Sequence, residues 1–187
     1  MALTAGSFIR QGPKPAAALS TTPAEDRDTF LRYVLPVKKP LYNFVRKALN
    51  FSPDTDDIFQ ETLLKGFRYF HSFDHRKNFK TWIFTIAHNL LKDAFQEKKR
   101  RLWPMPLEEV EEIAVDDSQT NTPHEVQEIY AAAAQLKPRQ REVFFLYYYN
   151  EFSVSEITEI TGLTRTNVKF MLHQARKAIK KAMEVQA

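Results

Sequence analysis

The sequence predicts an all-α fold made of two small helical domains joined by an extended acidic linker. Glycine is scarce, with 4 residues in 187, whereas long stretches are rich in Ala, Leu, Glu, Lys and Gln, which favour helices over strands. Apolar residues recur at helical spacing on both sides of a central stretch that has two prolines, many acids and no sustained periodicity. A chain of 187 residues is long enough for one or two small domains, so its length is consistent with two helical domains and a linker.

The composition excludes several classes of protein. The chain has no cysteine, which rules out disulfides, thiolate zinc sites and a cysteine nucleophile, and which fits a cytoplasmic location. It has no Gly-rich phosphate loop and no Ser-His-Asp arrangement, so we expect neither an enzyme nor a cofactor. His71 and His75 are four residues apart but lack a third ligand, so no metal is expected. No apolar run reaches the roughly 18 residues of a membrane span, so no membrane insertion is expected.

The charge is distributed unevenly along the chain. Residues 107–128 contain eight acidic side chains and no Lys or Arg. Since the whole chain has 27 basic and 23 acidic residues, the rest of it carries a net charge of +12. Two basic bodies that flank an acidic connector suggest a nucleic-acid partner. Charged residues that merely solvate the surface are the alternative.

A tail over residues 1–24 is expected to be disordered, because it is rich in Ala, Pro, Thr and Ser and has no apolar segment of the kind that a signal peptide needs. The first helical domain is expected over residues 25–101. It opens with two helical pieces that Pro36 and Pro40 interrupt. A further helix is predicted to start at Pro53, with the preceding serine as its cap.

The segment NFKTWIFTIAHNLLKDAFQEKKRR, residues 78–101, combines aromatic residues, a helical stripe and a basic end. Its i, i+3, i+4 apolar pattern places one face in the core, and His88, Asn89 and Lys92 fall on the opposite face. Exposed rings beside cations would suit unpaired DNA, because rings stack on bases while cations hold phosphates. An extruded base needs a polar pocket, which Asn89, Lys92 and the loop SFDHRKNF could form. Burial of the rings in the core is the alternative. The candidate rings are those of Phe79, Trp82 and Phe84.

An acidic linker is expected over residues 102–123 and a second helical domain over 124–187. Within that domain Ser153 and Glu156 form a capping-box pair at the start of a short helix. Gly162 is a natural turn residue after it. A short helix, a tight turn and a second helix predict a helix-turn-helix, whose second helix lies in the DNA major groove.

The last helix, from Arg165 to about Met183, is basic on one side. Between Arg165 and Lys181 it has six basic residues and no acidic one. Gln can pair with adenine and Lys with guanine, and Phe can contact a thymine methyl, so these residue types on the first turns suit base reading. Basic groups further along suit phosphates. An ordinary helical hairpin with a solvated basic face is the alternative. The candidate base readers are Lys169, Phe170, His173 and Gln174, and the candidate phosphate clamps are Arg176, Lys177, Lys180 and Lys181.

Two long segments resemble one known family. DIFQETLLKGFRYFHSFDHRKNFKTWIFTIAHNLLKDAFQEKKRR resembles region 2 of an extracytoplasmic-function (ECF) RNA polymerase sigma factor, and LKPRQREVFFLYYYNEFSVSEITEITGLTRTNVKFMLHQARKAI resembles region 4. The resemblance covers about residues 25–101 and 124–183 in the family's order, and both segments together make it highly specific. It implies a bacterial sigma factor that binds core RNA polymerase, directs it to promoters and assists promoter melting in transcription initiation.

The resemblance also implies which residues carry these roles. The residues that dock on the beta-prime clamp of core RNA polymerase are Asp57, Gln60, Glu61 and Lys65, and the beta subunit of the polymerase is a further expected partner. The residues for opened minus-ten DNA are Phe73, Asp74, His75, Arg76, Lys77, Asn78, Phe79, Asn89, Lys92 and Asp93. The residues for the minus-thirty-five duplex are Arg165, Lys169, Phe170, His173, Gln174, Arg176 and Lys177. Members of the family are commonly held inactive by an anti-sigma factor, so such a partner is expected here.

Four positions depart from the family's pattern. Phe59 stands where a small residue is usual before the glutamine of the docking segment, and Thr158 stands in place of the alanine of a usual EIA. Asn167 and Phe170 replace a common threonine and a common small residue on the reading helix. The last two bear on promoter specificity and leave the class of protein unchanged.

Two other classes of protein are compatible with a helix-turn-helix. A free-standing transcriptional regulator would bind duplex DNA unaided, typically as a dimer. A regulatory interaction protein would keep this shape and bind only protein. The segment from Asp57 to Glu61 discriminates between a sigma factor and a free regulator, because only the sigma factor needs a polymerase-docking helix.

Overall fold

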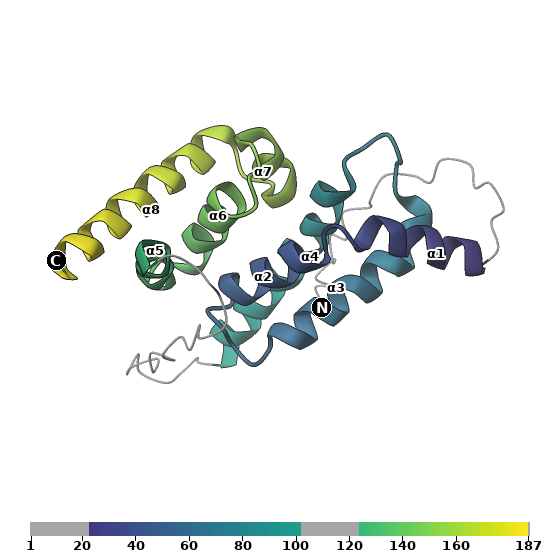
Figure 1. Cartoon of the computed structure of the whole chain (residues 1–187), viewed down its shortest axis with the longest axis horizontal. Helices are drawn as coiled ribbons and strands as arrows, with labels where there is room; N and C mark the ends of the chain where they lie inside the picture. Colours follow the sequence, from purple (N-terminus) through teal and green to yellow (C-terminus); the bar gives the residue numbers. More distant parts are fainter. Residues whose placement is uncertain (1–22, 102–123, 187) are drawn as a thin grey trace, which may run out of the picture.

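The residues that the computed structural model describes, 23–101 and 124–186, form helices joined by turns and short loops, and no strand lies among them (Figure 1). The predicted acidic linker and all but the last two residues of the predicted tail lie outside these described residues. The all-α prediction is confirmed for the described part of the chain. The elements are α1 (Pro23–Val34), α2 (Lys38–Ala48), α3 (Thr55–Tyr69), the 3-10 turn η1 (Phe70–Ser72), α4 (Phe79–Arg101), α5 (His124–Ala134), α6 (Pro138–Tyr148), α7 (Val154–Thr161) and α8 (Arg165–Gln186).

Helices α1 to α4 form a first body in which α3 packs against α4. Gly66 permits this close packing, because a Cβ at this position would lie 2.6 Å from Ile83 Cδ1 and 3.2 Å from Phe30 Cζ. Phe30 and Ile83 are themselves buried. The helical stripe of α4 therefore meets a side-chain-free patch of α3, and the two helices define the core of this body.

Two helix boundaries of the first body differ from the prediction. Helix α3 begins at Thr55 and not at Pro53, because the carbonyl of Ser52 first closes a turn by accepting from the Thr55 backbone N–H (3.1 Å) and hydroxyl (2.6 Å). Pro40 does not interrupt a helix. It lies in the first turn of α2, where the missing N–H has no intrahelical partner in any case.

Helices α5 to α8 form a second body that contains the predicted helix-turn-helix. The Ser153 hydroxyl accepts from the backbone N–H of Glu156 (3.2 Å), and the Glu156 carboxylate accepts from the backbone N–H of Ser153 (2.9 Å), so the predicted capping box at the start of α7 is confirmed. Gly162 ends α7 with φ +67° in the left-handed region that glycine favours. No helix in the described ranges combines the length and apolar character that crossing a membrane requires.

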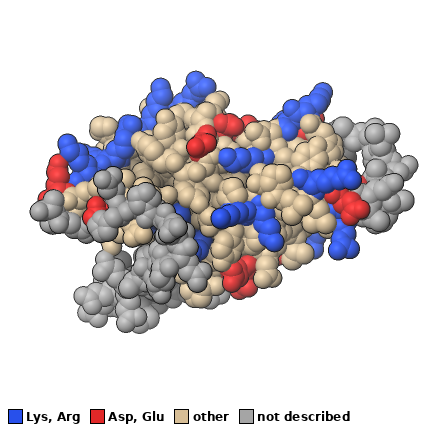
Figure 2. Space-filling view, viewed as in Figure 1, with Lys and Arg blue, Asp and Glu red and all other residues tan. Residues whose placement is uncertain are grey.

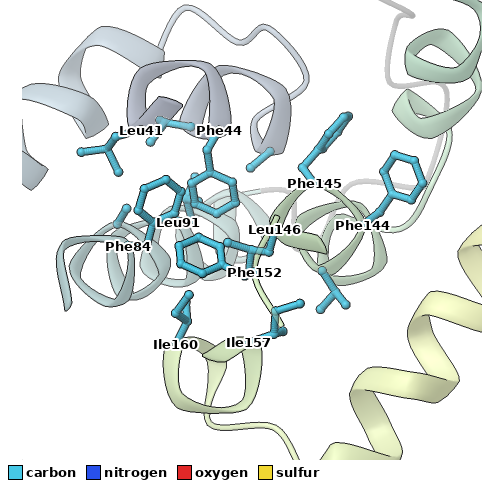
Figure 3. Packing of buried hydrophobic residues seen from close by; sticks show 14 of the residues in the cluster. Leu41, Phe44, Phe84, Leu91, Phe144, Phe145, Leu146, Phe152, Ile157 and Ile160 are labelled. Atoms are coloured by element: carbon cyan, nitrogen blue, oxygen red, sulfur yellow. The ribbon is translucent and has the colours of Figure 1, made fainter. Parts of the chain in front are cut away.

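The two bodies share one hydrophobic core. Helix α4 packs against α7, and α2 packs against α6. Figure 3 shows apolar side chains from both bodies meeting at this junction. The ring of Phe84 lies 5.1 Å from that of Phe44 in its own body and 5.0 Å from that of Phe152 in the other, measured between centroids. Side chains that are far apart in the sequence thus bring the two predicted domains into direct contact.

Candidate nucleic-acid interface

Helix α8 presents a basic face to solvent, as predicted for a groove-reading helix. Its inner stripe is buried against the other helices of the second body and consists of Val168, Leu172, Ala175 and Ile179. Of the predicted minus-thirty-five residues, Gln174 is half-buried and all the others are exposed. Phe170 is 59% exposed, which leaves its ring free to contact a thymine methyl. Figure 2 shows Lys and Arg side chains along the upper left edge of the molecule, where α8 lies in Figure 1.

The loop between η1 and α4 is held by local hydrogen bonds. The Asp74 carboxylate accepts two hydrogen bonds from the Arg76 guanidinium, both 2.9 Å, and a third from the Arg76 backbone N–H at 3.1 Å. These bonds lower the pKa of Asp74 to about 2. The Asn78 side chain caps α4 by accepting from the backbone N–H two residues on (2.8 Å). The side chains of His75, Arg76 and Lys77 are exposed, so the loop offers cations and donors on an ordered backbone.

The aromatic residues around this loop are mainly core residues, which corrects the expectation of exposed stacking rings. Phe79 and Phe84 are buried, and Trp82 is half-buried. Phe73 is buried as well, and the rings of Phe73 and Phe79 lie 5.1 and 5.4 Å from that of Trp82. Because clustered rings gain more from burial than from exposure, Phe73 and Phe79 support the loop from beneath. Of the three candidate stacking rings, Trp82 is the one that is partly exposed.

The polar face of α4 carries three exposed residues of the predicted minus-ten set: Asn89, Lys92 and Asp93. They lie about one turn apart, away from the stripe of α4 that packs on the second body. His88 was expected on the same polar face, and that expectation is wrong. His88 is buried, with its Nδ1 2.5 Å from Glu142 Oε1, because the second body covers this part of α4.

The predicted polymerase-docking residues share one face of α3. Asp57 and Gln60 are exposed, whereas Glu61 and Lys65 are partly exposed and paired, with Lys65 Nζ 3.7 Å from Glu61 Oε1. This spacing of three and four residues aligns them along the helix. Leu64 is 62% exposed beside them, so the face combines acidic and polar groups with an apolar side chain.

Polar contacts between the two bodies were not predicted from the sequence. Lys80 Nζ donates to the backbone carbonyl of Asn150 (2.6 Å), and Asn43 Nδ2 donates to the Tyr149 hydroxyl (2.7 Å). The buried Arg141 guanidinium donates from Nε and from one terminal nitrogen to the last carbonyl of α2, at 3.1 and 3.0 Å, and burial lowers the pKa of Arg141. Helical periodicity carries no signal for these contacts, since each joins residues that are far apart in the sequence.

Family models and curated relatives were compared with the chain. The model of Sigma-70 region 2 matches residues 34–101, and the model of Sigma-70, region 4 matches residues 126–179. The chain is 27% identical over 152 residues to the ECF RNA polymerase sigma factor SigX of Bacillus subtilis, which covers 78% of each chain. It is 26% identical over 169 residues to SigW of the same organism, covering 84% of this chain and 90% of SigW. The chain belongs to the ECF family of RNA polymerase sigma factors.

In this sigma factor the first body corresponds to region 2 and the second body to region 4. Sigma factors are transcription initiation factors and not catalysts. Two solved structures share the fold: RpoE in complex with the anti-sigma factor NepR from Bartonella quintana, and CnrH in complex with the cytosolic domain of CnrY. The first has a TM-score of 0.73 at 24% identity and covers 86% of this chain and 99% of the other. The second has a TM-score of 0.63 at 19% identity and covers 88% and 96%.

Proposed function

We propose that this sigma factor binds core RNA polymerase in the bacterial cytoplasm, directs it to specific promoters and assists promoter melting. The observation that supports the proposal best is that one chain carries three separate exposed surfaces. These are the polar face of α3, the loop before α4 with the polar face of α4, and the basic face of α8. A free-standing DNA-binding regulator would need only the last of them.

The face of α3 is the proposed docking site for the beta-prime clamp, with the beta subunit as a further contact of the sigma factor. Purified chain mixed with sigma-free core RNA polymerase should co-elute with it, and the double variant Gln60→Ala, Glu61→Ala should weaken that binding. Lys39→Ala, an exposed change on α2, is the matched control and should bind normally. Failure of the intact, folded chain to bind core polymerase, with no inhibitor present, would favour the free regulator.

The loop over residues 73–78 and the polar face of α4 are the proposed site for opened minus-ten DNA. Asn89 and Lys92 offer an amide and a cation to an extruded base and its phosphates. Asn89→Ala and Lys92→Ala should reduce the yield of open complexes more than they reduce polymerase binding. Gln96→Ala, exposed one turn further along α4, should affect neither. Equal loss of both activities would reject a specific role in holding the opened strand.

Helix α8 is the proposed reader of the minus-thirty-five duplex. Lys169 and Phe170 lie on its first turns, where groove-reading helices meet base edges, and Arg176 lies further along, where a phosphate contact is expected. Lys169→Ala should relax sequence preference at one base pair, at a cost of about 1–3 kcal/mol for the preferred base. Binding competition between promoter variants measures this, and a loss that is uniform across all sequences would assign Lys169 to phosphate instead.

An anti-sigma factor is the proposed regulatory partner. The fold is shared with a sigma factor that was crystallised with its anti-sigma factor, and this similarity motivates the proposal. Affinity purification of the tagged chain from native cells should recover a second, non-polymerase protein that lowers transcription when added back. Repeated recovery of RNA polymerase alone would count against such a partner.

A further inference from the structure

We propose that Tyr33 of α1 fixes His75 of the loop over residues 73–78 as a hydrogen-bond donor, so that His75 reads the keto oxygen of a thymine or guanine in the opened strand. This inference rests on the proposed function and deepens it, because it states which chemical group one part of the proposed minus-ten site recognises. Tyr33 lies outside every set of site residues that the sequence predicted. It acts through His75 and is therefore a positioning residue.

The His75 ring is held by three aromatic neighbours. Its centroid lies 5.6 Å from that of Phe70 and 5.2 Å from that of Phe73, in edge-to-face arrangements, and 5.8 Å from that of Tyr33. Phe70 and Phe73 are buried, so they form a fixed base for the ring, and edge-to-face rings attract one another. The ring therefore has a defined orientation although His75 is an exposed residue.

A hydrogen bond joins His75 to helix α1. The Tyr33 hydroxyl oxygen lies 3.3 Å from His75 Nδ1, although 42 residues separate the two in the sequence. The contact is possible because α1 packs against η1, which leads into the loop. The Tyr33 ring is half-buried and lies 5.1 Å from the ring of Phe79 at the start of α4. Tyr33 is thus itself held in place at both edges of the loop.

This hydrogen bond decides which nitrogen of the imidazole carries the proton. In a neutral imidazole one ring nitrogen donates and the other accepts, and the partner of one nitrogen fixes the role of the other. Among the described residues the Tyr33 hydroxyl has no hydrogen-bond partner besides His75, so donation from this hydroxyl to Nδ1 satisfies both groups. Nε2 then carries the proton, and the exposed side chain of His75 offers it to DNA.

A fixed N–H donor distinguishes keto from amino groups on an extruded base. Thymine presents its O4 acceptor where cytosine presents an amino group, and guanine presents O6 where adenine presents an amino group. The acidic side chain of the loop, Asp74, does not compete for this donor, because the Arg76 guanidinium already occupies its carboxylate. The exposed cation of Lys77 suits a phosphate beside such a base.

Imidazole ¹⁵N NMR of the free chain tests the role of Tyr33 without polymerase or DNA. The measurement is made at about pH 8, where an ordinary imidazole is neutral. The chain has 5 histidines, and His75→Gln assigns the His75 signals by their loss. His75 should be the Nε2–H tautomer in the natural chain. Its Nδ1 resonance should move in Tyr33→Phe, because the accepting nitrogen loses its donor.

The matched control for the NMR measurement is Tyr69→Phe, which removes the hydroxyl of an exposed tyrosine at the end of α3. This change should leave the His75 signals in place. Thermal unfolding should show that both tyrosine variants remain folded, since each keeps its ring. An Nδ1–H tautomer in the natural chain, or an unmoved Nδ1 resonance in Tyr33→Phe, would overturn the proposal.

Base preference of the holoenzyme tests the reading itself. Core polymerase with the natural chain is bound to promoter fragments whose minus-ten strand is already unpaired. The fragments form pairs that differ by a thymine-to-cytosine or guanine-to-adenine exchange at one position. At one position the keto base should be preferred by about fivefold, the factor that one neutral hydrogen bond contributes. Tyr33→Phe should lower this preference to about twofold or less, whereas Tyr69→Phe should keep it.

The variant His75→Gln separates positioning from a general effect of Tyr33. A glutamine amide carries its own N–H donors and does not need Tyr33 to protonate them, so Tyr33→Phe should change nothing further in this background. An equal effect of Tyr33→Phe in both backgrounds, or a loss of affinity that is uniform across all bases, would overturn the proposal. Absence of promoter binding by the natural holoenzyme would refute the proposed function and the base reading with it, whereas the NMR outcome concerns Tyr33 and His75 alone, so the two failures are distinct.

Discussion

Replacing Gly66 with alanine tests how closely α3 approaches α4. At an exposed helix position this change stabilises by about 1 kcal/mol, because glycine is a poor helix former. Here the new Cβ would lie 2.6 Å from Ile83 Cδ1 and 3.2 Å from Phe30 Cζ. Carbon atoms pack best at about 3.5–4.0 Å, so the Ile83 methyl must move by about 1 Å. Overpacking of this kind costs about 1–3 kcal/mol, and the net change in the free energy of unfolding is a loss of about 0–2 kcal/mol.

A double-mutant cycle with Ile83→Val isolates the contact, because valine lacks the Cδ1 atom that the new Cβ meets. Ile83→Val alone should cost about 0.5–1.5 kcal/mol. The combined variant should be more stable than the sum of the two single changes by at least about 0.5 kcal/mol, as expected for residues in contact. Chemical denaturation followed by far-UV circular dichroism measures each variant. A Gly66→Ala chain more stable than the natural one, or strictly additive effects, would refute the close approach.

Three further predictions concern single side chains. Ser153→Ala should lower the stability of region 4 by about 1 kcal/mol through loss of the capping box, measured by thermal unfolding, whereas Ser155→Ala should not. The Asp74 carboxyl should titrate at about 2 by NMR, and Arg76→Gln should return the pKa of Asp74 towards about 3.9. The Asp74–Arg76 ion pair is complete above that ordinary pKa and is lost as the pH falls through about 2. Titration of Asp74 near about 4 in the natural chain would contradict the geometry. Lys177→Ala should reduce the slope of log affinity against log salt by about 1 while leaving sequence preference intact, and an unchanged slope would exclude a phosphate contact.

The elements that depend on local sequence were predictable. The capping pair at Ser153 and Glu156, the turn at Gly162 and the inner stripe of α8 were all expected and are all present. Each depends on residues within about one turn of one another, and helix caps and stripes are set at that range. The start of α3 was displaced from Pro53 to Thr55, because a local turn competes with the first helical turn.

The exposure of individual site residues was less predictable. A helical pattern places residues on a face, but it does not say what covers that face. His88 and Asn89 are adjacent and both polar, yet His88 is buried against Glu142 and Asn89 is exposed. Phe79 and Phe84 were candidates for stacking on bases and are buried. Their neighbours come from other helices, and no spacing within α4 identifies those helices.

By itself, the sequence determined that this chain is an all-α sigma factor with two helical regions, where its helix-turn-helix lies, and which residue types line its last helix. Periodicity, capping and motif content are local properties, and they do not depend on which other helices each helix packs against. Only the tertiary structure decided that the two regions share a core, that Lys80 is engaged by Asn150, and that His88 pairs with Glu142. Burial and pairing are properties of residues distant in sequence, because they arise only when separate helices come together and exclude water.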